Sequence, residues 1–330
     1  MDYSQLTKPF FVLAPMDDVT DTVFRNVVDS CAPADLYFTE FVNVDGLQSP
    51  GRNKLLKKLR FTANETRLVA QIWGLNPENF RKTAEQIADG TFAKELGLPD
   101  GANFVGVDLN MGCPAKSEVQ HGTCSALIKP ENRDLAKQII DATKDGLAGR
   151  LPLSVKTRVG FNEVDMTWIK FLLEQKLSML TVHGRTRKQM SKVPADWNLI
   201  GQAREVRDAL KVNTLIVGNG DVENRAHGTK LAKQYKLDGV MIGRGLFHDP
   251  FAFAEESPWA NKTREERIAL YAKHVERFAE TWGDQQRPVH TLNKFCKIYI
   301  QNFDGAKELR EQFMSATTPH ELQQMIARAS

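Results

Sequence analysis

The chain has 330 residues, of which 42% are hydrophobic and 26% are charged. This balance excludes a disordered chain, and no apolar run approaches the ~20 residues that a membrane-spanning helix requires. Lysines and arginines number 44 against 41 acidic residues, and the net charge of +3 is too small to indicate a nucleic-acid partner by itself. The four cysteines form no recognisable motif, and no signal-peptide pattern opens the sequence. We therefore expect a globular, cytoplasmic protein.

Eight short apolar runs recur along the first 245 residues, separated by helix-like segments. Runs that are apolar throughout are typical of strands buried on both faces of a parallel sheet. The expected strands are Phe10–Pro15, Leu36–Phe41, Arg67–Trp73, Phe104–Leu109, Leu153–Arg158, Met179–His183, Thr214–Val217 and Gly239–Ile242. Eight strands alternating with helices predict an α/β fold, a (β/α)₈ TIM barrel, with a doubly wound sheet as the alternative.

Helix-start signals support this alternation. Asn76 precedes Pro77, and Asp196 is positioned as the N-cap of a helix over 197–210. After Gly245 the strands stop, and helices are expected over 264–282, 289–303, 306–315 and 320–329. We therefore expect two domains, a barrel over residues 1–245 and an all-helical domain over residues 246–330.

Polar or sulfur-containing side chains lie at the ends of the expected strands. In a (β/α)₈ barrel the chemistry is found at the C-terminal ends of the strands, so we expect these side chains to converge. They are Met16, Glu40, Gln71, Asn110, Lys156, Arg158, His183, Asn219 and Arg244.

Glycines follow the last two expected strands, at Gly218 and Gly220 and again at Gly243 and Gly245. Glycine allows backbone N–H groups to approach an anion closely, and the loops after strands seven and eight form the usual barrel phosphate site. Any single glycine could simply serve a turn, but the pair of loops favours a phosphate site.

Cys113 follows the fourth expected strand, where a thiol could act as a nucleophile or a proton donor. Cys124 lies in the same loop and competes for that role. Cys113 and Cys124 are not at zinc-ligand spacing, so we expect no metal site.

Lys156 ends the fifth expected strand and admits two functions. It could form a Schiff base, as in aldolases, or present a fixed cation to a cofactor. His183 begins the segment His183-Gly184-Arg185-Thr186-Arg187, whose two guanidinium groups favour contact with an anion or RNA.

Five cations lie within residues 51–60. Such runs are usually solvated surface, and that is the default interpretation of this run alone. Together with the cations at 185, 187, 188 and 192, the run could form a basic rim that attracts a phosphate backbone.

At this point the sequence resembles the tRNA-dihydrouridine synthases nearly from end to end. The pairing of Asn110-Met111-Gly112-Cys113-Pro114 with His183-Gly184-Arg185-Thr186 is specific to that family. The other matching segments are 14–21 with Phe24-Arg25, 39–41, 106–109, 154–160, 218–221, 240–245 and, in the helical tail, 306–310.

The resemblance implies a tightly bound FMN and the reduction of the C5–C6 double bond of tRNA uridines with NADPH or NADH. It implies that Cys113 donates the proton to C5, and that Asn110, Arg158, Arg185 and Arg187 lie near the substrate. The cofactor-binding residues that it implies are Pro15, Met16, Gln71, Lys156, His183, Asn219, Gly220, Asp221, Gly243 and Arg244. It also implies a helical tRNA-binding domain, and we expect a monomer with no metal and no membrane partner.

Two segments depart from the family pattern. The residues after Arg187 lack the usual tyrosine, and Thr123-Cys124 stands where the loop is often rich in glycine. The rival interpretations are an FMN barrel that reduces a small pyrimidine or enone, and a flavin-free aldolase that uses Lys156. A non-catalytic RNA-binding module is a weaker alternative, because it has no use for so many polar strand ends.

Overall fold

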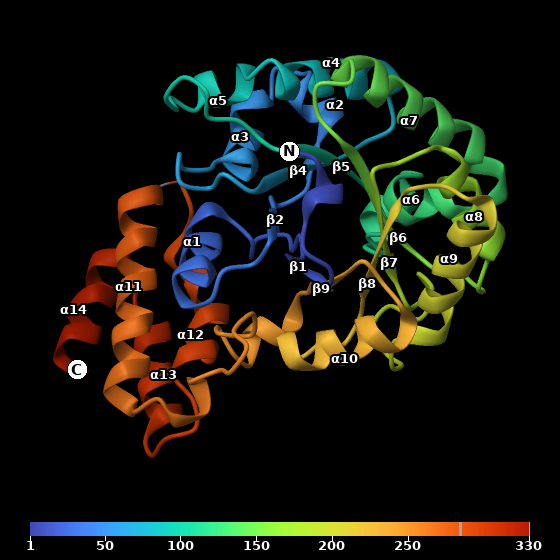
Figure 1. Ribbon diagram of the computed structural model, residues 1–330. Helices are drawn as coiled ribbons and strands as arrows, with labels where there is room; N and C mark the ends of the chain where they lie inside the picture. Colours follow the sequence, from blue (N-terminus) through green and yellow to red (C-terminus); the bar gives the residue numbers. More distant parts are fainter. Residues whose placement is uncertain (284–285, 330) are drawn as a thin grey trace. The chain divides into compact units, whose positions relative to one another are not determined.

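The computed structural model describes residues 1–283 and 286–329, and these residues divide into two compact units (Figure 1). The first unit consists of Met1–Asp21, Ala34–Val222 and His227–Gly243. The second consists of Thr22–Pro33, Glu223–Ala226 and the described residues from Arg244 onward. The functional division at residue 245 stays a prediction. None of the described helices is long and apolar enough to cross a membrane.

The first unit is built on a closed ring of parallel strands. Its strands are β1 (Phe10–Leu13), β2 (Leu36–Phe38), β3 (Val42–Asn43), β4 (Leu68–Trp73), β5 (Gly106–Met111), β6 (Leu153–Arg158), β7 (Met179–His183), β8 (Leu215–Asn219) and β9 (Gly239–Ile242). Strand β1 pairs with both β2 and β9, β2 pairs with β4, and each later strand pairs with the next. The two residues of β3 extend the line of β2 beside the end of β4. The ring thus has eight positions, and the predicted (β/α)₈ barrel is confirmed.

The strand boundaries differ from expectation by about two residues at several ends. β1 stops at Leu13, before Pro15, which has no N–H group for a ladder. β5 continues to Met111 and β8 to Asn219, because polar residues at these ends still pair with the neighbouring strand.

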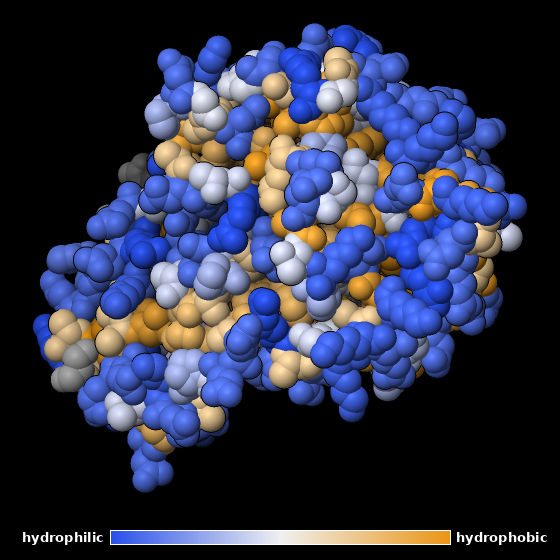
Figure 2. Space-filling view, in the orientation of Figure 1, coloured by the Kyte–Doolittle hydropathy of each residue, from blue (hydrophilic) through white to orange (hydrophobic). Residues whose placement is uncertain are grey.

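Helices lie outside the ring between the strands (Figure 1). They are α2 (Val44–Leu47), α3 (Arg52–Leu56), α4 (Pro77–Ala88), α5 (Thr91–Glu95), α6 (Lys116–Gln120), α7 (Arg133–Leu147), α8 (Met166–Glu174), α9 (Trp197–Leu210) and α10 (Arg225–Tyr235). Figure 2 shows mainly hydrophilic residues over α7 to α9, with hydrophobic residues visible between them.

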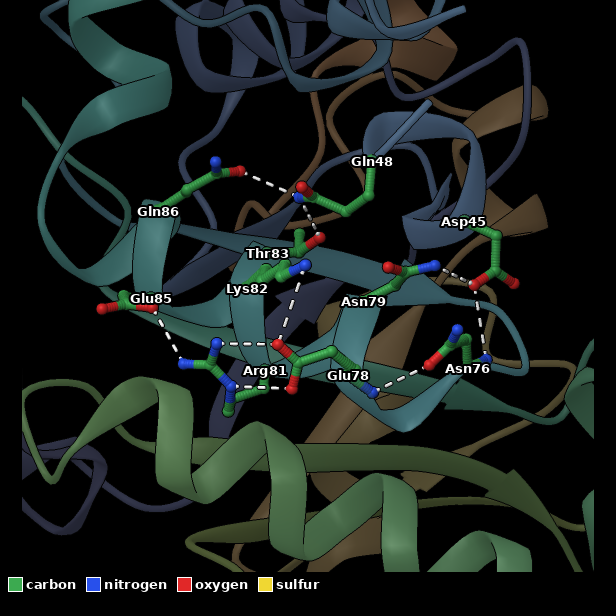
Figure 3. Close-up of polar contacts among 10 residues, drawn as sticks. All are labelled: Asp45, Gln48, Asn76, Glu78, Asn79, Arg81, Lys82, Thr83, Glu85 and Gln86. Atoms are coloured by element: carbon green, nitrogen blue, oxygen red, sulfur yellow. Dashed lines mark hydrogen bonds and ion pairs between the residues drawn. The ribbon is translucent and has the colours of Figure 1, made fainter. Parts of the chain in front are cut away.

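The expected helix starts at Asn76 and Asp196 are confirmed. The Asn76 side chain accepts a hydrogen bond from the Glu78 amide at 3.0 Å, and Asp196 accepts one from the Asn198 amide at 2.9 Å. Figure 3 shows how Asp45 fixes the start of α4 by accepting hydrogen bonds from the Asn76 amide and from the Asn79 side chain. These caps satisfy amides that have no partner within the helix.

The interior of the ring changes from apolar to polar along the strands. Inward positions alternate with outward ones, so the residues that face inward share one parity on each strand. At the N-terminal ends they pack as an apolar cluster that includes Tyr3, Phe10, Val12, Leu36, Phe38, Val69, Met179, Leu215, Val217 and Met241. Further along, the same faces carry Gln71, Asn110, Lys156, His183 and Asn219. The C-terminal end of the barrel is therefore a polar mouth, and the N-terminal end is a packed apolar base.

The second unit is helical, with an aromatic core. Its helices are α1 (Thr22–Cys31), α11 (Arg264–Trp282), α12 (Asn293–Tyr299), α13 (Ala306–Met314) and α14 (Pro319–Ala329). Phe24 stacks on Phe295 with ring centroids 5.1 Å apart. The ring nitrogen Nδ1 of His274 lies 2.9 Å from the Tyr299 hydroxyl, and burial lowers the pKa of His274 to about 3.

The expected helix over 289–303 was too long. The segment is a 3₁₀ turn at Val289–Leu292 followed by α12, and the chain leaves the helical conformation at Ile300. The Arg310 guanidinium donates to the Ile300 carbonyl at 2.7 Å and so satisfies an acceptor that the helix end leaves free.

Gly106 at the start of β5 can be tested through its contact with Tyr3. A Cβ at residue 106 would lie 1.9 Å from the Tyr3 hydroxyl oxygen, so Gly106→Ala should lower the free energy of unfolding by about 1–3 kcal/mol. That hydroxyl is buried without a hydrogen-bond partner in the described residues, so Tyr3→Phe alone should cost little. The double variant should recover part of the loss in urea denaturation, and strictly additive effects would contradict the contact.

Candidate active site at the mouth of the barrel

The strand ends bring most of the predicted residues of the first unit together. Register places Asn110 beside Lys156, Arg158 beside His183, and His183 beside Asn219. Arg244 belongs to the second unit, where it is exposed at the start of a 3₁₀ turn, Arg244–Phe247.

A chain of hydrogen bonds runs up the inward face of β4 to β6. The Asp108 carboxylate accepts from the Ser154 hydroxyl at 2.6 Å and from Nε2 of Gln71 at 2.7 Å. The side-chain oxygen of Gln71 in turn accepts from Nδ2 of Asn110 at 3.1 Å. Asp108 is fully buried, and this burial raises its pKa to about 7 in spite of the hydrogen bonds. The two amide side chains are therefore fixed in orientation by one buried carboxyl group.

Asn110, held in this orientation, fixes the start of the loop that carries Cys113. Its side-chain oxygen accepts from the amides of Gly112 at 3.1 Å and Cys113 at 2.9 Å. A Cβ at residue 112 would lie 3.1–3.2 Å from the backbone of Thr157, so glycine permits the loop to approach β6 closely. The loop thus leaves β5 in one defined direction.

Arg158 ties two loops together. Its Nε donates to the Gly112 carbonyl at 2.7 Å, and its Nη1 donates to the carbonyls of Thr186 at 3.2 Å and Met190 at 3.1 Å. The residue is buried, with 6% of its surface exposed. Its guanidinium therefore connects the Cys113 loop to the loop after β7, which includes residues 188–195.

Cys113 and Cys124 share a thiol–thiol hydrogen bond. Cys113 is partly exposed, whereas Cys124, at the start of the 3₁₀ turn Cys124–Ile128, is fully buried. The Cys124 thiol donates to the Cys113 sulfur, and this lowers the pKa of Cys113 to about 7. The same contact, together with burial, raises the pKa of Cys124 well above its ordinary value. Of the two thiols, Cys113 is therefore the one that titrates near neutral pH.

Lys156 presents an amine without a direct partner. Burial and the nearby Arg158 charge lower its pKa to about 8, against the opposing effect of Asp108. In residues 1–283 and 286–329 it has no hydrogen-bond or ion-pair partner, although its side chain is only partly exposed. A donor left open in this way at the mouth is suited to a bound electron-rich group.

His183, the buried Arg185 and the exposed Asp221 form a polar contact beside Gly220. Nη1 of Arg185 lies 3.1 Å from Nε2 of His183, and its Nη2 is paired with Asp221. A guanidinium can only donate, so Nε2 accepts and the hydrogen of the neutral ring lies on Nδ1. Gly220 has φ +128°, and a Cβ there would lie 3.1 Å from the His183 ring, so the position requires glycine.

The predicted phosphate-binding residues of the first unit lie on adjacent strand ends. The Asn219 side chain donates to the Met241 carbonyl at 3.0 Å, which fixes β8 against β9. A Cβ at Gly243 would lie 3.2 Å from Ala14 and 3.5 Å from the Met16 sulfur. Met16 and the half-buried Pro15 therefore border the same region as the glycine loops.

Comparison with known proteins places the chain in a family. The dihydrouridine synthase family model matches residues 12–329. A probable tRNA-dihydrouridine synthase of Staphylococcus aureus (strain COL) is 43% identical over 98% of this chain and 94% of its own length. The chain belongs to the dihydrouridine synthase family. Probable tRNA-dihydrouridine synthase 2 of Bacillus subtilis (strain 168) is 42% identical over 98% of this chain and 95% of its own length.

Similarity to solved structures is limited to the fold. A histamine dehydrogenase from Rhizobium sp. 4-9 matches with a TM-score of 0.51 and 11% identity, over 81% of this chain and 48% of the other. This likeness agrees with the barrel seen here.

Several predicted site residues of this family member have protein partners. Arg185 is buried against Asp221 and the Val193 carbonyl, and Arg187 lies with its guanidinium 5.3 Å from the Phe161 ring centre. Asp221 also accepts from the Ala195 amide at 2.9 Å. Substrate or cofactor contact by these three residues stays a prediction, and the structure adds their part in holding the loop after β7.

Sequence reasoning missed Asp108 as a site residue. It lies two positions before Asn110 on the same inward face, and that spacing is the signal that could have pointed to it.

Some of the cations in the basic segment at 51–60 form ion pairs within the protein. Arg52 pairs with Glu95 at 2.8 Å, and Lys58 pairs with Asp17 in the loop after β1. Lys54 and Lys57 are exposed, and neither has a hydrogen-bond or ion-pair partner within the described part of the chain. The part of this segment in a basic rim stays a prediction.

The second unit contains a hollow of about 550 Å³. Its lining includes the cations Lys262, Lys273 and Arg277 and the carboxylates Glu266 and Glu276. Lys262 pairs with Glu266, and Glu276 lies in the same lining as Lys273 and Arg277.

The two hydrogen bonds that the Asn110 side chain accepts from the Gly112 and Cys113 amides, here called the Asn110 clamp, can be tested directly. Asn110→Ala removes the acceptor for the Gly112 and Cys113 amides, and it should cost about 1–3 kcal/mol of unfolding free energy. Hydrogen exchange of the peptide containing these two amides should become faster. Asn198→Ala on α9 removes an exposed side-chain contact and should leave that peptide unchanged. Unaltered protection in Asn110→Ala would contradict the clamp.

Proposed function

We propose that this protein is a tRNA-dihydrouridine synthase, an oxidoreductase that reduces the C5–C6 double bond of tRNA uridines. The observation that carries the proposal is membership of the family together with a Cys113 thiol that a buried network holds at the barrel mouth. The 43% identity to the probable tRNA-dihydrouridine synthase of Staphylococcus aureus supports the same substrate class.

FMN fits the residues present at the mouth. The unpartnered amine of Lys156 suits an electron-rich ring, and the Gly220 and Gly243 loops would offer backbone N–H groups to a phosphate. Gln71 and His183 would border the flavin ring. Pro15, Met16 and Asn219 would line the rest of the flavin pocket. A flavin held by these residues would supply the hydride that C6 of the uracil requires, with NADPH or NADH as the source of electrons.

Cys113 would supply the proton that C5 needs. Its thiol is partly exposed at the mouth and titrates with a pKa of about 7, so a large fraction is protonated at neutral pH. The Cys124 thiol and the Asn110 clamp orient it. A uridine must leave its base stack to reach this depth, which costs a few kcal/mol. Attraction between the tRNA phosphates and the cations around the mouth would offset part of this cost.

The aldolase interpretation of Lys156 has one point in its favour, since a pKa of about 8 leaves some free amine at neutral pH. Family membership and the Cys113 network count against it, because an aldolase has no role for a thiol held in this way.

The variant Cys113→Ala tests the proton donor. Flavin absorbance and flavin reduction by NADPH should persist, while dihydrouridine formation in unmodified tRNA should fall by about 10²–10⁴-fold. Because the donor must carry its proton, the wild-type rate should fall as the pH rises through about 7. Mass spectrometry of tRNA nucleosides measures both effects.

The matched control is Cys31→Ala, which removes a partly exposed thiol of the second unit and should keep full activity. Full activity in Cys113→Ala would assign the proton to another group. A purified protein that neither carries nor takes up FMN would overturn the flavin chemistry, and reduction of free uridine in preference to tRNA would favour a small-molecule reductase.

Lys54 and Lys57 test the tRNA surface. Replacing both by alanine should weaken tRNA binding and reduce the slope of log K against log salt by about one per lysine. The exposed lysines Lys230 and Lys233 on α10 provide a control pair of equal charge. Equal slopes for the two double variants would show that residues 51–60 are ordinary solvated surface.

A further inference from the structure

Two thiols in the Cys113 loop are in direct contact. Cys113 lies just beyond β5, and Cys124 begins the 3₁₀ turn that ends the same loop. The Cys124 thiol donates a hydrogen bond to the Cys113 sulfur, and the Ser125 amide donates to the Cys113 carbonyl at 3.4 Å. Side chain and backbone therefore hold the two ends of the loop against each other.

Cys124 occupies an unusual position for a residue with a side chain. Its φ is +53°, in the left-handed region that favours glycine, and it is completely buried. The left-handed conformation disfavours a Cβ, so Cys124 holds its thiol beside Cys113 in a backbone conformation that glycine adopts more readily.

The two sulfurs differ in access and in proton affinity. Cys113 is partly exposed, and the Cys124 hydrogen bond lowers its pKa to about 7. The other two cysteines are inert by comparison, because burial raises the pKa of Cys31 to about 12 and of Cys296 to about 11. A thiolate that is open to solvent and touches a protected second thiol is the arrangement of a redox-sensitive pair.

We propose that Cys113 and Cys124 form a reversible disulfide under oxidation by a peroxide, with Cys113 as the attacking thiol and Cys124 as the resolving thiol. The pair is a modification site within the loop that carries the proton donor.

The chemistry balances in two steps. The Cys113 thiolate attacks one oxygen of hydrogen peroxide, the O–O bond breaks, and a sulfenic acid and hydroxide form. The Cys124 sulfur then attacks the Cys113 sulfur, the S–S bond forms, and the S–O bond breaks. The hydroxyl group leaves with the Cys124 proton as water. Two thiols are oxidised by two electrons in total, and the peroxide is reduced to two waters.

The consequence for catalysis rests on the proposed function. A disulfide removes the thiol hydrogen of Cys113, so uridine reduction stops until a dithiol restores it. It also spares Cys113 from the irreversible sulfinic and sulfonic acids, because the buried Cys124 traps the sulfenic acid first.

The test maps the thiols of the purified full chain after treatment with hydrogen peroxide, by alkylation under denaturing conditions, digestion and mass spectrometry. The expected product is a peptide that links Cys113 to Cys124, absent after dithiothreitol, with Cys31 and Cys296 still alkylated. Dihydrouridine formation, measured in parallel, should be lost with peroxide and recover at least tenfold with dithiothreitol.

Cys124→Ser separates the two thiols, and Cys31→Ser is the matched control. In Cys124→Ser, Cys113 should become sulfinic acid and activity should not recover, whereas Cys31→Ser should behave as wild type. Sulfinic Cys113 with alkylated Cys124 in the wild-type protein would overturn the proposal, as would a bond from Cys113 to another thiol. A protein that forms the disulfide but never reduces uridine would contradict the proposed function and leave the redox pair standing.

Discussion

A buried carboxyl group organises the mouth of this barrel. Asp108 is surrounded by strands, and a polar group in such a place must find partners or destabilise the fold. Its partners are Ser154 and Gln71. Because the amide nitrogen of Gln71 donates to Asp108, its side-chain oxygen is oriented to accept a hydrogen bond from the Asn110 side chain. Because Asn110 then accepts from two backbone amides, the direction of the Cys113 loop follows from the need to satisfy one carboxyl group deep in the ring.

The same constraint explains why the base and the mouth of the ring differ. Below Asp108 the base is packed by Tyr3, Phe10 and Leu36, whose side chains are apolar apart from the Tyr3 hydroxyl. Above it, Lys156 and His183 lie where burial is incomplete and a bound group can reach them. Apolar packing at one end of the strands gives rigidity, and this rigidity makes the polar positions at the other end reproducible.

The strands and most of the converging residues could be predicted from the sequence, because both follow from short-range pattern. Apolar runs of five or six residues identify buried parallel strands, and strand ends in a ring must meet at one face. Contacts between different strands carry no such local signal. The resemblance places Arg158 and Arg185 near the substrate, and nothing in the sequence indicates that their guanidinium groups also hold loop carbonyls and Asp221. Nor does it show that α1 joins the second unit although it follows β1.

The Cys113 loop shows how far one side chain can combine structural and chemical roles. Asn110 fixes the start of the loop, Arg158 fixes the Gly112 carbonyl, and Cys124 holds the sulfur. The first two contacts act on the backbone, so they position any residue at 113. The third acts on the sulfur alone, lowers its pKa to about 7 and places a second thiol beside it. A loop with glycine at 124 would keep the first two contacts and lose the third, so the acidity of this thiol depends on Cys124 as well as on the barrel that positions it.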